Sequence, residues 1–152
     1  MTPGQISKRI VAERLDWIET MIVRIRALPL QDRQVFRADA RNVAAAESYL
    51  RRALEALLDL GRHILAKGLG YGVSEYKQIA AKLCELDVLA EPERNLLVQM
   101  AGYRNRLVHF YHEIGEDELF QICTGELGDL EQVAEAIRCW ICAHPEQIDE
   151  TL

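Results

Sequence analysis

The 152-residue chain has no long apolar segment. No unbroken apolar run approaches the about 20 residues that a membrane-spanning helix needs. Residues 1–17 carry charges where a secretory signal requires an apolar stretch. We therefore expect a cytoplasmic protein with no membrane contact. With 49% apolar residues the chain is too hydrophobic for intrinsic disorder, and its length suits one domain over 1–152.

The chain also lacks an excess of basic residues. It holds 18 Lys and Arg against 24 Asp and Glu, a formal charge of −6. Proteins that bind nucleic acid over their whole surface are basic, because they neutralise phosphates, so binding of that kind is excluded. The acidity is local, however. Residues 113–152 hold 1 basic and 11 acidic residues, net −10, whereas residues 1–67 hold 12 and 8, net +4. A local arginine-rich cleft remains compatible with this composition.

Paired metal-ligand motifs are missing as well. Cys139 and Cys142 form a C-x-x-C with His144 nearby, but Cys84 and Cys123 stand alone and supply no second ligand pair. In a reducing compartment the four cysteines should remain thiols. We expect no metal site and no cofactor.

Glycine and proline are absent from residue 30 to residue 60, and no window alternates as a β-strand does. Apolar residues recur every three or four positions, which predicts an all-α protein, an up-and-down bundle of four to six helices. His63 should lie on the surface near a helix end. The expected helices are a first one ending at Pro29, one long helix over 30–60, a third capped by Ser74, a fourth with Pro92 in its first turn, and two over about 116–123 and 129–142.

The segment 102–112 differs from the rest of its predicted helix. It gathers two Arg, an Asn, two His and two Tyr into eleven residues. On a straight helix His109 lies about 140° round the axis from Arg104, so the two do not point the same way. Either the Arg104 side chain reaches round, or the helix is distorted, or a second copy of the chain completes the site. The simpler alternative is a polar helix end in which His109 bonds a neighbouring carbonyl.

The pattern Arg104-Asn105-x-x-x-His109-x-Tyr111 resembles the R-x(4–6)-H-x-Y signature of the HepT-like ribonuclease toxins of the HEPN superfamily. The likeness covers about 35–152. It includes Ala40-Arg41-Asn42, the helix over 76–89 and the turn at Gly128-Asp129-Leu130.

This resemblance implies a metal-independent RNA endonuclease, in which a ribose 2′-hydroxyl of single-stranded or loop RNA attacks the adjacent phosphorus; DNA is not expected as a substrate. His109 would act as general acid or base. Arg104 would hold the phosphate and offset its developing charge, with Asn105 in a supporting, orienting role. The family's cleft forms at a homodimer interface.

The resemblance also implies a type VII toxin–antitoxin pair. The partner is a minimal nucleotidyltransferase (MNT) antitoxin, in a complex that can be a larger hetero-oligomer. This antitoxin transfers AMP to the tyrosine that corresponds to Tyr111. The added phosphates would repel RNA from the cleft.

Two other functions are open on the residues alone. A non-catalytic helical module could bind a nucleotide or present a substrate to a nucleotidyltransferase, because holding a phosphate needs the same arginine and histidine. A structural dimerisation domain would be explained by the 4-3 apolar spacing of the first helix.

Overall fold

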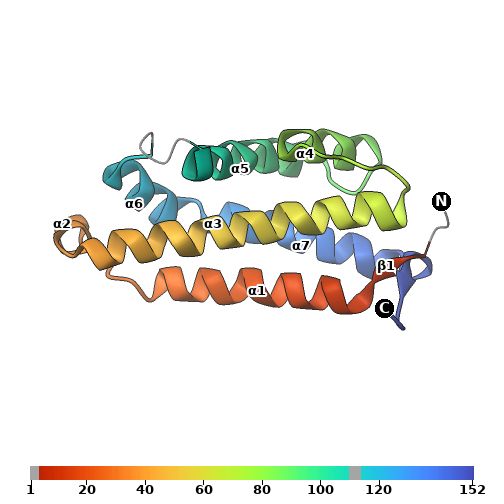
Figure 1. Cartoon of the computed structure of the whole chain (residues 1–152), viewed down its shortest axis with the longest axis horizontal. Coiled ribbons are helices and arrows are strands. Elements are labelled where there is room, and N and C mark those ends of the chain that lie inside the picture. The colour runs from red at the N-terminus through yellow and green to blue at the C-terminus, as the bar shows by residue number, and fades with distance from the viewer. Residues whose placement is uncertain (1–3, 110–113) are drawn as a thin grey trace.

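Helices make up nearly all the regular structure in residues 4–109 and 114–152, the part of the chain that this computed structural model describes. The predicted all-α bundle is confirmed (Figure 1). None of the described helices combines the length and hydrophobicity needed to cross a bilayer. The helices are α1 (Lys8–Arg26), α2 (Arg33–Ala38), α3 (Ala40–His63), α4 (Tyr76–Glu85), α5 (Glu91–His109), α6 (Glu116–Gly125) and α7 (Leu127–Ala143), with a π-helical turn η1 (Ile64–Gly68) and a 3-10 turn η3 (Pro145–Gln147).

Helix α3 runs through the centre of the bundle. In Figure 1 it lies between α1 on one side and α4 and α5 on the other, with α7 behind. It packs against each of the other six described α-helices. Most of its apolar stripe is buried in a core to which all seven contribute, and each large side chain buried in this way contributes about 1.5–3 kcal/mol. The buried α3 residues are Ala46, Leu50, Ala53, Leu54, Ala56, Leu57, Leu58, Leu60 and Gly61.

The single helix predicted over 30–60 is wrong, because the chain breaks at Asp39. This residue has an extended backbone (φ −115°, ψ 110°), and its carboxylate accepts a hydrogen bond from the Arg41 N–H at 2.9 Å. Asp32 caps α2 in the same way, accepting from the Gln34 N–H at 2.9 Å. A capping carboxylate stabilises a helix start by about 1 kcal/mol. Together with the short α2, the described residues form seven α-helices rather than four to six.

Two other predicted boundaries are also corrected. Helix α4 begins after Glu75, not Ser74, and no side chain caps it. The break between the last two helices falls at Glu126, whose backbone is not helical (φ −122°, ψ 3°). Gly125 and Gly128, which the predicted bounds place between the helices, lie within α6 and α7.

A short parallel strand pair, not expected from the sequence, joins the two ends of the chain: β1 (Ile6–Ser7) pairs with β2 (Ile148–Asp149). The Ser7 hydroxyl caps α1 by accepting from the Ile10 N–H at 3.1 Å. The Ser7 N–H in turn donates to Nε2 of His63 at 3.0 Å. His63 is therefore a half-buried acceptor that holds β1 against α3, and the predicted surface role is wrong.

This contact should make stability depend on pH. Burial, followed by the positive charges of Lys67 and Arg14, lowers the pKa of His63 below its ordinary value. As the pH drops, His63 therefore takes up a proton more readily in the unfolded chain than in the folded chain. The free energy of unfolding should fall as the pH drops below about 6.5. His63→Gln keeps an acceptor for the Ser7 N–H and should remove this part of the pH dependence. The measurement is urea unfolding at pH 7.5 and pH 5.5, with His144→Gln as control. Equal pH dependence in wild type and His63→Gln would contradict the assignment.

Candidate functional site

A cleft of about 500 Å³ opens between the end of α3, the start of α4 and the C-terminal half of α5. Three of its lining residues are the ones that the sequence pattern singled out: Arg104, Asn105 and His109. The structure thus brings these three to one cleft of a single chain. The other lining residues are Arg62, Ser74, Glu75, Tyr76 and Lys77.

The Arg104 side chain turns sideways from α5. Its guanidinium carbon lies 4.5 Å from the centre of the Tyr76 ring, and Nη1 donates to Oδ1 of Asn105 at 3.2 Å. Nη2 lies 4.0 Å from Oε2 of Glu55. Helix α5 continues to His109. Within a single chain, the helix is not distorted before His109, and an Arg104 side chain that reaches round brings the two residues to one cleft.

Tyr76 holds a second arginine at the cleft. The guanidinium carbon of Arg62 lies 4.6 Å from the ring centre, so two cations share one aromatic ring. The Tyr76 hydroxyl donates to Oδ1 of Asp59 at 2.8 Å, and Nη2 of Arg62 donates to the Ser74 carbonyl at 3.3 Å. Burial and the hydrogen bond to Asp59 raise the pKa of Tyr76, which keeps the phenol neutral. The ring thus contacts both guanidinium groups, and Asp59 also lies 3.6 Å from Arg62.

Gly61 explains why α4 lies close enough to bring Tyr76 to this position. A Cβ atom at residue 61 would stand 2.9 Å from Cγ2 of Ile79 and 3.0 Å from Cδ1 of Leu83, both on α4. Real side chains do not pack so closely. The glycine that precedes Arg62 therefore lets α4 pack directly on α3.

Sequence reasoning missed Arg62 and Tyr76. Tyr76 fitted the apolar stripe of its helix, and Arg62 belongs to another helix with no motif around it. No spacing rule links residues that only the packing of α3 against α4 brings together.

His109 is exposed and is the last residue of α5. Nearby, Arg106 makes a bidentate ion pair with Glu118 of α6, with both N–O distances at 2.7 Å. These hydrogen bonds lower the pKa of Glu118, so the pair persists well below neutral pH. The pair ties the end of α5 to α6. Tyr111, the predicted modification site, lies outside the described residues.

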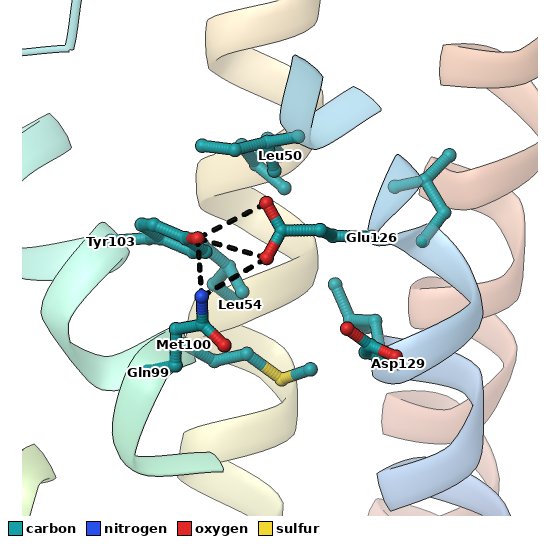
Figure 2. A pocket seen from close by; sticks show the side chains of 10 residues that line it. Leu50, Leu54, Gln99, Met100, Tyr103, Glu126 and Asp129 are labelled. Carbon is teal, nitrogen blue, oxygen red and sulfur yellow. Dashed lines mark hydrogen bonds between the residues drawn. The ribbon is translucent and has the colours of Figure 1, made fainter. Parts of the chain in front are cut away.

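A second pocket, shown in Figure 2, lies between α3, α5 and the junction of α6 with α7. The Tyr103 hydroxyl donates to the Glu126 carboxylate, with oxygen distances of 2.9 and 3.1 Å, and Gln99 donates to both groups at 2.7 and 3.1 Å. Burial and the bond to Glu126 raise the pKa of Tyr103 to about 12. The interior volume of about 10 Å³ suits a single water at most. This network fastens the helix break to α5 and has no room for a substrate.

The C-x-x-C residues lie elsewhere. Cys139 and Cys142 are exposed on α7, and the His144 ring stacks on Trp140 with ring centres 4.4 Å apart. Nδ1 of His144 also lies 2.8 Å from the Trp140 carbonyl. Within residues 4–109 and 114–152, no group of three or more His, Cys, Asp or Glu side chains is arranged to hold a metal ion.

Comparisons with known proteins agree with this architecture. The mRNA nuclease HepT of Shewanella oneidensis is 27% identical over 130 residues, which cover 85% of this chain and 96% of the relative. The solved structure of a tri-AMPylated HEPN toxin from Shewanella oneidensis, in complex with an MNT antitoxin, superposes with a TM-score of 0.77 at 25% identity, over 86% of this chain and 97% of that one.

A third similar structure shows the fold alone. YutE of Bacillus subtilis, a cytosolic protein of unknown function, has a TM-score of 0.80 at 18% identity, over 96% of this chain and 98% of that one. The family model described as ribonuclease HepT-like matches residues 18–137. The chain therefore belongs to the ribonuclease HepT-like family.

Proposed function

We propose that this protein is a metal-independent endoribonuclease and the toxin of a toxin–antitoxin pair. The observation that carries the proposal is that Arg104, Asn105 and His109 line one open cleft together with a second arginine, Arg62. The similarity of this chain to an mRNA nuclease of the same family supports the reaction class.

The proposed reaction needs one proton acceptor and fixed positive charge. An imidazole such as that of His109, exposed at a helix end, can take the proton of a ribose 2′-hydroxyl near neutral pH. The 2′-oxygen then bonds to phosphorus while the bond from phosphorus to the 5′-oxygen breaks. Arg104 and Arg62 stabilise the charge that gathers on the phosphate oxygens, and no metal is needed for this. Asn105, which accepts from Arg104, supports the arginine's position.

The leaving 5′-oxygen must gain a proton, and one chain offers one His109. We propose a homodimer in which the second copy faces the open side of the cleft and supplies a second His109, which in its protonated form donates this proton to the 5′-oxygen. Single-stranded or loop RNA is the proposed substrate, because its backbone can align the 2′-hydroxyl with the phosphate.

Cleavage of single-stranded RNA in EDTA tests the activity. Wild type should cut, and His109→Ala and Arg104→Ala should each lose about 10²- to 10⁴-fold in rate, the usual contribution of a general acid–base group or of a transition-state charge contact. His144→Ala is the matched control, because His144 directly follows α7 and does not line the cleft, and it should cut like wild type. An inert wild type, or a His109→Ala variant that cuts equally well, would refute the ribonuclease. An inert wild type that still binds AMP would favour the non-catalytic nucleotide-binding module.

Tyr76 tests whether the ring positions Arg104. Tyr76→Phe keeps the ring and loses only the hydrogen bond to Asp59, so kcat/KM should stay within about threefold of wild type. Tyr76→Leu removes the cation–π contact with both arginines and should lower kcat at least about tenfold, because small misplacements of a charge contact are costly. Thermal unfolding of both variants is measured alongside. If Leu and Phe are equally active, Tyr76 does not position the arginines.

We also propose that an MNT antitoxin silences the enzyme by transferring AMP to Tyr111. The relative of 25% identity is a tri-AMPylated toxin bound to such an antitoxin, which supports this partner and this modification. In the sequence Tyr111 stands two residues after His109. Each AMP adds a negative phosphate near a cleft lined by Arg62 and Arg104, which would compete with RNA for the same cations. A hetero-oligomer with the antitoxin follows.

Intact-mass analysis tests the modification. After incubation with the MNT enzyme and ATP, wild type should gain one or more AMP masses and lose RNA cleavage. Tyr111→Phe should gain none and remain active. Tyr71→Phe, which alters a tyrosine that is 43% exposed, is the control and should be labelled like wild type. Equal labelling of the Tyr111→Phe variant would rule out Tyr111 as the acceptor.

A further inference from the structure

Another hollow borders α3 next to the cleft. This α1–α3 groove has a volume of about 210 Å³ and is lined by Arg14 and Trp17 of α1 and by Arg51, Arg52, Glu55, Ala56 and Asp59 of α3. In Figure 1, α3 lies between α1 below and α4 with α5 above, so the groove and the cleft flank the same helix.

The groove and the cleft are positively charged on an acidic protein. Together their linings include six Lys and Arg side chains and three carboxylates, net +3, whereas the whole chain carries −6. Arg14 and Arg52 are both exposed, and neither forms an ion pair with a carboxylate within the described residues. Unpaired arginines that face a groove are suited to bind phosphate groups.

Glu55 and Asp59, one turn apart on α3, stand between the groove and the cleft. Each is already paired. Glu55 accepts from Arg51 at 2.8 Å and lies 4.0 Å from Arg104, while Asp59 lies 3.6 Å from Arg62. The two carboxylates therefore link the arginines of the groove to those of the cleft. A nucleic-acid strand that passes over Glu55 and Asp59 therefore meets carboxylates whose charge these arginines already offset.

Trp17 adds an aromatic surface beside these cations. Its side chain is 38% exposed, whereas Trp140, the other tryptophan of the chain, is 9% exposed and stacked on His144. A partly exposed aromatic ring in a basic groove is the combination with which proteins bind single-stranded nucleic acid: the cations track the backbone, and a base stacks on the ring for about 1–3 kcal/mol.

We infer that the α1–α3 groove binds single-stranded RNA that extends from the cleavage cleft, with Arg14 and Arg52 on phosphates and Trp17 on a base. This inference rests on the proposed ribonuclease function. Arg52 and Arg62 are ten residues apart, about 15 Å along the α3 axis, so the two hollows together hold more than a dinucleotide.

The binding test uses the cleavage-deficient His109→Ala protein and a fluorescein-labelled, single-stranded 12-mer RNA. Adding Arg14→Gln and Arg52→Gln should weaken binding at least about tenfold and reduce the slope of log K against log salt by about 1.4, the value for two lost phosphate contacts on a single strand. The matched control adds Arg9→Gln and Arg138→Gln, two arginines outside both hollows, and should bind like the parent protein. Equal affinities for the three proteins would overturn the inference.

Tryptophan fluorescence tests the stacking separately. Unlabelled 12-mer should quench the emission of the His109→Ala protein, and Trp17→Leu should abolish this quenching, since Trp140 is buried. Quenching that survives Trp17→Leu would overturn the role of Trp17. If Arg14→Gln with Arg52→Gln instead changes the molar mass in light scattering, the groove joins copies of the chain and the inference is overturned.

Substrate length separates the groove from the ribonuclease itself. With His109 intact, Arg14→Gln with Arg52→Gln should lower the ratio of 12-mer to dinucleotide cleavage rates at least about fivefold, because a dinucleotide occupies the cleft alone. The Arg9→Gln with Arg138→Gln protein should keep the wild-type ratio, and an unchanged ratio in both would contradict the groove. If wild type cuts neither RNA, the proposed function fails, and the binding and fluorescence tests still decide the groove.

Discussion

The burial of α3 is the constraint on which the rest of the structure depends. Because all six other described α-helices pack on it, only a narrow polar edge of α3 reaches solvent in its C-terminal half. That edge carries charges of both signs at helical spacing: Arg51, Arg52, Glu55, Asp59 and Arg62. The cleft and the α1–α3 groove both border this edge. The packing of the other helices on α3 thus determines which of its charged side chains are open to solvent.

The distribution of charge shows how an acidic chain keeps a positive site. Much of the acidity of residues 113–152 lies in α6 and α7 and is paired with arginines outside the cleft. Glu116 and Asp117 pair with Arg37, and Glu118 pairs with Arg106. Glu131 near the start of α7 binds Arg26 at the end of α1. These exposed pairs add little stability. Their effect is on the electrostatic field, because none of these paired acidic side chains lines the cleft or the α1–α3 groove.

The fold class and part of the candidate site could be predicted from the sequence, because helical periodicity and a motif within one helix are local properties. Predicting that Arg104, Asn105 and His109 lie together requires no knowledge of packing beyond how far one arginine side chain reaches. Asp39 could not be foreseen as a helix break, since the apolar stripe continues past it and the gain from a cap is small. His63 and Tyr76 depend on contacts across 56 and 17 residues, with Ser7 and Asp59. Amphipathic side chains of this kind fit a surface or a core pattern equally well until their partners are known.

The shared ring of Tyr76 has an electrostatic consequence for the cleft. Two guanidinium groups within 4.6 Å of one ring centre repel each other, and in water they would separate. The ring's negative face, Asp59 and Glu55 offset this repulsion and hold the groups in place. A phosphate that enters the cleft therefore meets charge and donors that are already oriented, so little reorganisation is needed as charge develops on its oxygens.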